Sequence, residues 1–97
     1  MAPAVLDGLG WGLYRSGLQE DAVFLFRRNL EAFPDRYIPN ESLADALWIM
    51  GDHETPLQMY EDWLERNPDH AMARRLLTTL KAGGLRDWSP LRADAGR

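Results

Sequence analysis

Two stretches of the chain, "LFRRNLEAFPD" at residues 25–35 and "MYEDWLERNPD" at residues 59–69, place the same chemical types in the same slots. Phe26 is matched by Tyr60, and the two positions are 34 residues apart. The same register extends backwards along the chain and matches Gly17 with Gly51, Leu9 with Leu43, Leu13 with Leu47, Tyr14 with Trp48 and Gly10 with Ala44. The chain therefore contains a repeated unit, and a period of this length is typical of helical repeat proteins.

Within each unit the apolar residues recur at intervals of three and four, which predicts amphipathic helices. The first helix of the first unit is expected to bury a stripe of Leu6, Leu9 and Leu13. Glycines 17 and 51 are expected to end the first helix of each unit, since glycine adopts a positive φ at little cost. Prolines 34 and 68 are expected to end the second helices, and Asp52 is a plausible N-cap. The predicted helices span residues 4–16, 19–33, 36–50, 53–66 and 70–82.

This pattern resembles the tetratricopeptide repeat family, and the resemblance covers about residues 3–82. The slots that carry it are filled by Leu6, Leu9-Gly10, Leu13, Ala22, Phe26, Asn29-Leu30 and Pro34, and in the second unit by Asn40, Leu43-Ala44, Leu47, Pro56, Tyr60, Trp63-Leu64 and Pro68. The resemblance implies an all-α fold, namely an α-solenoid of two helix–turn–helix repeats in a right-handed superhelical stack. The expected layout is one domain over residues 1–83, with repeat one at 3–36, repeat two at 37–70, a capping helix at 70–82 and a flexible tail at 84–97.

Small residues at two of these slots have a packing reason. Gly10 and Ala22 are expected to let the two helices of the first hairpin approach closely. Asn29 and Trp63 stand where the family usually has alanine, so Trp63 is expected to press against Ala71 and Ala73 of the following helix. In the capping helix, leucines 76, 77 and 80 are expected to face inwards.

The residues that carry enzyme chemistry are absent or badly placed for it. The chain has no cysteine, and its two histidines, His53 and His70, are too far apart for a helical metal pair. No nucleophile elbow or phosphate-binding glycine loop is found. We therefore expect no enzymatic activity, no catalytic residues, no metal and no cofactor. The acidic middle and basic end of the chain argue against a nucleic-acid partner, and the lack of a long apolar run or signal peptide predicts a cytoplasmic protein without membrane contact.

In the resembled family the inner faces of the first helices line a concave groove that binds a partner segment. The resemblance places eight partner-binding residues in this groove: Trp11, Tyr14, Arg15, Glu41, Asp45, Trp48, Ile49 and Arg75. The same positions include Ala4, Asp7, Ile38, Met72 and Thr79. Trp11, Tyr14 and Trp48 are thus expected on the groove surface, and the alternative is that these aromatic rings fill the core.

Three functions follow from these expectations. The first is a non-enzymatic protein–protein interaction module that binds a protein or peptide segment in the groove. The second is a homo-oligomerisation module forming a homodimer, since two repeats and a cap fall short of about three repeats and Phe24 and Leu25 add apolar surface. The third is an accessory repeat region of a larger bacterial enzyme such as a serine hydrolase, because "FRRNLEAFPD" is similar to paired repeats appended to such enzymes.

Overall fold

The computed structural model describes residues 2–83, which form five helices joined by turns that each contain a glycine or a proline. The helices are α1 (Pro3–Arg15), α2 (Gln19–Ala32), α3 (Tyr37–Ile49), α4 (Glu54–Arg66) and α5 (Ala71–Lys81). Each predicted boundary lies within one residue of the observed one, and every regular element in the described range is a helix. The all-α class is therefore confirmed. The predicted tail at 84–97 lies outside the described residues.

The two turns that follow α1 and α3 have the same geometry. Gly17 and Gly51 adopt positive φ angles of 88° and 103°. The next residue donates its backbone N–H back into the helix in both cases, from Leu18 to Leu13 and from Asp52 to Leu47, each at 2.9 Å. The chain thus reverses direction after each helix while its backbone N–H groups remain hydrogen-bonded. These hydrogen bonds require a residue in the left-handed conformation, which glycine adopts readily.

The helix after the second of these turns is capped by a side chain. The Asp52 carboxylate accepts hydrogen bonds from the backbone N–H groups of Glu54 and Thr55, at 3.2 and 3.0 Å. These groups would otherwise lack partners in the first turn of α4. Asp52 therefore caps α4 as predicted, although it precedes the N-cap residue His53 by one position.

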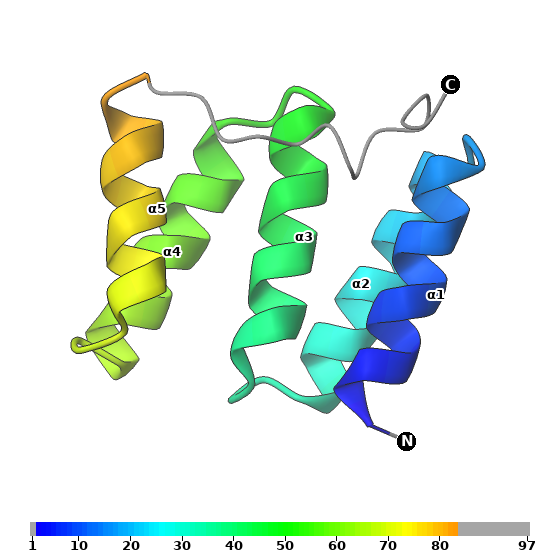
Figure 1. Ribbon diagram of the computed structural model, residues 1–97, viewed down its shortest axis with the longest axis horizontal. Coiled ribbons are helices and arrows are strands. Elements are labelled where there is room, and N and C mark those ends of the chain that lie inside the picture. Colours follow the sequence, from blue (N-terminus) through cyan, green and yellow to red (C-terminus); the bar gives the residue numbers. More distant parts are fainter. Residues whose placement is uncertain (1, 84–97) are drawn as a thin grey trace.

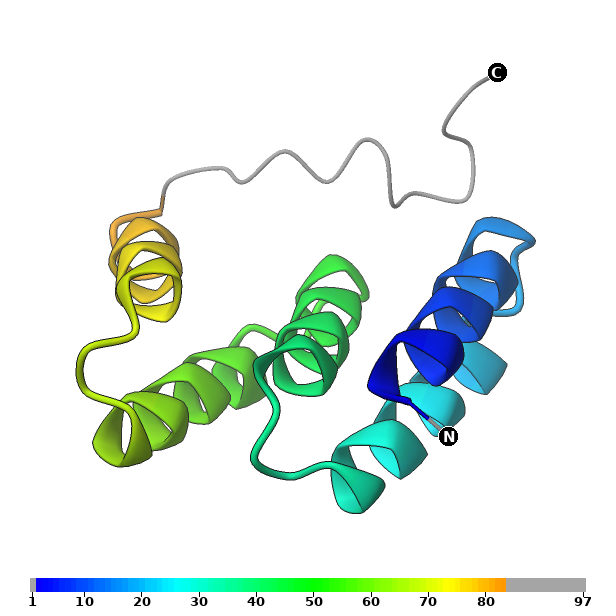
Figure 2. The same cartoon turned by 60° about the horizontal axis from the view of Figure 1, so that its bottom comes forward.

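The helices form two layers. Helices α1, α3 and α5 lie side by side, and α2 and α4 lie behind them, as Figures 1 and 2 show from two directions. Each helix contacts the next in the chain, and α1 also contacts α3. Helices α1, α3 and α5 all run in the same direction, so their N-terminal ends lie at one edge of the molecule (Figure 1).

Two apolar clusters fill the space between the layers. The first joins α1, α2 and α3 and consists of Trp11, Tyr14, Ala22, Phe26, Leu43, Ala46 and Leu47. The second joins α3, α4 and α5 and consists of Ala44, Tyr60, Trp63, Ala73, Leu76 and Leu80. We call them the first and the second core. Because α3 contributes to both, the two cores are continuous through one helix.

The small residues stand at the closest approaches. A Cβ atom on Gly10 would overlap the ring of Phe26, so glycine allows α1 and α2 to meet there. Ala44 and Tyr60, which follow these two positions by one period, are both fully buried in the second core. Trp63 packs in the second core with Ala73 as predicted, whereas Ala71 is exposed.

The buried face of α1 differs from the predicted one. Leu9 is 55% exposed, whereas Gly10, Trp11 and Tyr14 are buried. The reason is that α2 and α3 both pack on the Trp11 side of α1, and no helix of the described range packs on the Leu9 side. Leu43, one period later, is only 4% exposed because α3 has the α1–α2 hairpin beside it.

Candidate functional site

The face of the α1–α3–α5 layer turned away from α2 and α4 is where the predicted groove residues were expected. We call it the inner face. The structure places three of the eight predicted binding residues inside the protein instead: Trp11 is 7% exposed, Tyr14 1% and Asp45 3%. The expectation that Trp11 and Tyr14 lie on the surface is therefore wrong, and the alternative that they fill the core is right.

Trp11 is held by contacts from three directions. Its ring lies 5.3 Å from that of Tyr14 and 4.8 Å from that of Phe26, measured between ring centroids. Its indole Nε1–H donates to the Ser42 hydroxyl at 3.1 Å, and that hydroxyl in turn donates to the Asp7 carboxylate. These hydrogen bonds link α1 to α3. Trp11 therefore holds the two helices together, whereas the resemblance placed it on the groove surface.

Asp45 has a similar structural role. Its Oδ1 accepts a hydrogen bond from the Tyr60 hydroxyl at 3.3 Å, which links α3 to α4. A buried carboxylate with protein partners is not positioned to meet a ligand.

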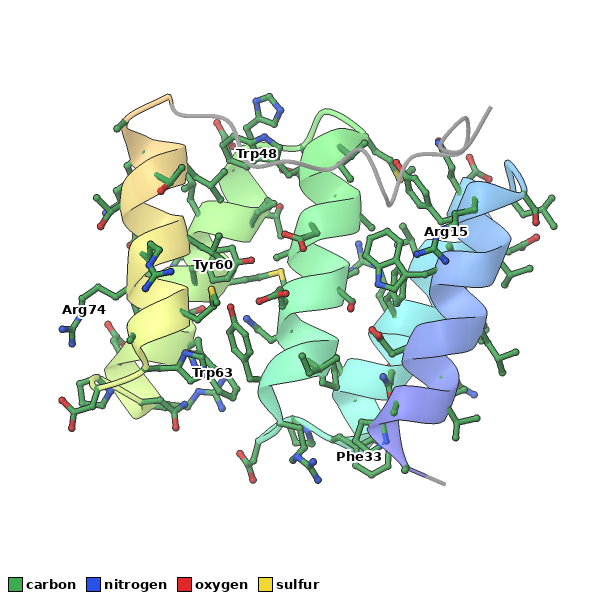
Figure 3. All side chains as sticks on the ribbon, viewed as in Figure 1. Arg15, Phe33, Trp48, Tyr60, Trp63 and Arg74 are labelled. Atoms are coloured by element: carbon green, nitrogen blue, oxygen red, sulfur yellow. The ribbon has the colours of Figure 1, made fainter. Side chains whose placement is uncertain are left out.

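Trp48 and Ile49 are partly buried at the C-terminal end of α3. Trp48 packs against the second core, and its ring stacks on that of His53 with centroids 4.2 Å apart and planes 19° apart. Figure 3 shows Trp48 on the side of α3 that faces α4 and α5. Ile49 packs against the first core. Of the eight predicted residues, only Arg15 and Arg75 are well exposed, while Glu41 is partly buried.

The electrostatics of the inner face centre on Asp7. Desolvation by burial raises the pKa of the Asp7 carboxyl above its ordinary value, the hydrogen bond from Ser42 opposes this, and the charge of Glu41 adds to it. Two neighbouring acidic groups on α1 and α3 thus favour a cation near them.

A pocket of about 340 Å³ lies between the N-terminal ends of α1 and α3. It is lined by Ala2, Pro3, Ala4, Arg36, Tyr37, Ile38 and Pro39. Ala4 and Ile38 are two of the groove positions carried over from the resemblance, and the structure brings them together. Arg36 and Pro39 were not among the predicted groove residues; their place just at the boundary between the two units was the available signal.

Two large apolar side chains are exposed at equivalent positions of neighbouring helices. Ile38 near the start of α3 is 48% exposed, and Met72 near the start of α5 is 45% exposed. They are one period apart, as are Ala4 and Ile38. Equivalent positions of parallel neighbouring helices make a row, so the N-terminal ends of α1, α3 and α5 present an apolar row of Ala4, Ile38 and Met72.

Other kinds of site find little support among residues 2–83. No group of three or more histidine, aspartate or glutamate side chains there is arranged to hold a metal ion. None of the five helices combines the length and apolar character needed to cross a bilayer. Comparison of the chain with protein-family models, curated proteins and solved structures gave no match.

Proposed function

We propose that this chain is a non-enzymatic protein-interaction module that binds a partner segment along its inner face. The observation that carries the proposal is the exposed apolar row of Ala4, Ile38 and Met72 beside the pocket between α1 and α3. Exposed apolar surface next to a concavity is typical of a binding site for protein segments.

We further propose that the module consists of two tetratricopeptide-like repeats and a capping helix in a right-handed stack. Support comes from features that recur after one period: the positive-φ glycines, the Leu18 and Asp52 turn hydrogen bonds, and the close packing of Gly10 with Phe26 and of Ala44 with Tyr60. Asp7, Glu41 and Arg75 are also one period apart. They form a charged row that lies three residues further along α1, α3 and α5 than the apolar row.

The two rows suggest the chemistry of the partner. An apolar side chain fits the pocket lined by Ala4 and Ile38, and a basic side chain next to it fits the acidic Asp7–Glu41 pair. The expected partner is therefore an extended segment in which an apolar anchor is followed by Lys or Arg.

Selection from a random peptide library with the intact chain tests this proposal. Selected peptides should carry the apolar–basic pattern, and in NMR titrations they should shift the amide signals of Ile38, Glu41 and Met72. The double variant Ile38→Glu, Met72→Glu should weaken binding at least about tenfold because each anchor contributes at hot-spot level.

The matched control is Leu9→Glu, since Leu9 is 55% exposed on α1 but lies away from the row. This variant should bind like the wild type. Selected peptides that shift only signals from α2 or the Leu9 side of α1, or that tolerate the double variant, would place binding elsewhere and refute the proposal.

A further inference from the structure

The outer face of α2, turned away from α1, carries a symmetric arrangement of charges. It consists of Glu20, Asp21, Phe24, Arg27 and Arg28, all of which are exposed. The opposite side of the helix, with Ala22, Phe26 and Asn29, is buried. Phe24 is 60% exposed, the highest value among the large apolar side chains of residues 2–83.

The charges are ordered around Phe24. The two acidic residues precede it by four and three positions, and the two arginines follow it by three and four positions. At 1.5 Å per residue, the acidic and basic pairs lie about 5–6 Å along the helix axis on either side of Phe24. A half-turn about an axis through Phe24 therefore exchanges the acidic pair with the basic pair.

We propose that the outer faces of α2 from two copies of this chain pack against each other in antiparallel orientation, forming a symmetric dimer. Phe24 meets Phe24 on the two-fold axis. Glu20 lies opposite Arg28 of the other copy, and Asp21 lies opposite Arg27. A parallel arrangement would bring like charges together, so the order of charges selects the antiparallel one.

The side chains concerned are available for this contact. Neither ion pair found within residues 2–83 uses any of the four charges. The Arg28 guanidinium lies over the Phe24 ring, 5.6 Å from its centroid, so one flank of the ring is already lined by a cation. A helix that pairs with this face in antiparallel orientation must itself carry acidic residues before its apolar residue and basic residues after it. The outer face of α2 in a second copy of the chain has this order of charges.

The proposed contact is independent of the inner face, because α2 lies behind α1 and its outer face points away from the α1–α3–α5 layer (Figure 2). One helix face buries a small area, so the dimer belongs among weak interfaces. Contacts between exposed charges are screened by salt, so association should weaken as ionic strength rises.

Sedimentation velocity over a concentration series tests the proposal. The wild type should show a monomer–dimer equilibrium at concentrations up to about 1 mM. Phe24→Glu should weaken association at least about tenfold. The charge-reversed variants Glu20→Arg, Asp21→Arg and Arg27→Glu, Arg28→Glu should each lose self-association, whereas an equimolar mixture of the two should form a heterodimer.

Controls separate this contact from others. Leu9→Glu alters an apolar position on α1 that is 55% exposed, close to the exposed fraction of Phe24, and should leave dimerisation unchanged. The neutral variant Glu20→Gln, Asp21→Asn keeps the helix intact and should dimerise more weakly and with less dependence on salt. Circular dichroism of every variant checks that it is folded.

Three results would overturn the proposal. One is a wild type that stays monomeric throughout the concentration series. Another is a dimer broken by Leu9→Glu and not by Phe24→Glu, which would place the interface on α1. The third is a mixture of folded charge-reversed variants that fails to associate, since the proposed pairing then has no part in self-association.

Discussion

Gly10 shows how one residue sets the distance between two helices. A Cβ atom at this position would overlap the Phe26 ring, whereas a Cβ on Gly8 or Gly12 would meet nothing within 4 Å apart from the adjacent residues and backbone of its own helix. Three glycines in one helix thus differ only in what faces them. The close approach at Gly10 was predictable from the repeat register, because the matching position holds the small residue Ala44.

The variant Gly10→Ala should lower the free energy of unfolding by about 1–3 kcal/mol, because relieving the overlap requires α1 or Phe26 to shift. Gly12→Ala is the matched control and should raise it by up to about 1 kcal/mol through helix propensity alone. Urea unfolding of both variants measures the difference. Equal stabilisation by the two substitutions would mean that α1 and α2 are not closely packed at Gly10.

At the scale of the element, the sequence predicted where every helix of the described range ends and which faces of α2 and α5 are buried, but not which face of α1 is buried. Helix ends depend on local signals such as Gly17, Gly51 and the Asp52 cap, so the boundaries were right within one residue. Helix α1 carries two apolar stripes, one through Leu9 and one through Trp11. Which stripe is buried depends on the neighbours that pack beside it, and this information is not local.

The same reason explains the errors at the candidate site. Trp11, Tyr14 and Asp45 occupy groove positions in the resembled family, yet here they lie beneath the surface. The Trp11–Ser42–Asp7 hydrogen bonds could not be inferred from spacing, because they join residues of α1 and α3 that are distant in sequence.

Burial of the Asp7 carboxyl at this link between α1 and α3 makes the stability of the protein dependent on pH. Burial raises the pKa of Asp7 above 3.8, so its contribution to stability is fully present below pH 3.8 and is lost as pH rises through the folded-state pKa. Asp7→Asn removes the buried charge and keeps an oxygen that accepts from Ser42. This variant should be more stable than wild type at neutral pH, and its stability should fall less as pH rises above 4.

Urea unfolding of wild type and Asp7→Asn between pH 3 and 7 measures this difference. Ser42→Ala is the control for the hydrogen bond itself and should destabilise the protein across the whole range. Parallel pH profiles for wild type and Asp7→Asn would show that Asp7 does not carry the pH dependence.

At the scale of the whole molecule, the two ends of the helix row are unlike. Helix α5 turns Leu76 and Leu80 to the second core and exposes Arg74, Thr78 and Lys81, as predicted for a capping helix. Arg74 lies on the outer side of α5 in Figure 3, and its guanidinium donates to the carbonyl oxygen of Pro68 in the turn before that helix. Helix α1 at the other end leaves Val5 and Leu9 exposed. The positions equivalent to them in α3, Pro39 and Leu43, are buried. The α5 end of the helix row therefore presents polar side chains to solvent, whereas the α1 end leaves apolar side chains exposed.

The two cores should unfold together because they share α3. Leu43 and Ala46 belong to the first core, Ala44 to the second, and Met59 packs against both. Leu80 is 5% exposed in the second core, so Leu80→Ala should cost about 2–5 kcal/mol. Helix α5 packs on α4, α4 packs on α3 and α3 packs on α1, so loss of α5 packing should loosen α3 through α4 and then α1.

Amide hydrogen exchange tests this coupling directly. In Leu80→Ala, protection should fall in α1 by nearly as much as in α5, since the most protected amides of both cores exchange through one global unfolding event. Met72→Ala is the control, because Met72 is 45% exposed on the same helix and its truncation should leave protection in α1 unchanged. Protection lost in α4 and α5 but retained in α1 and α2 would show instead that the two cores unfold separately, each with stability of its own.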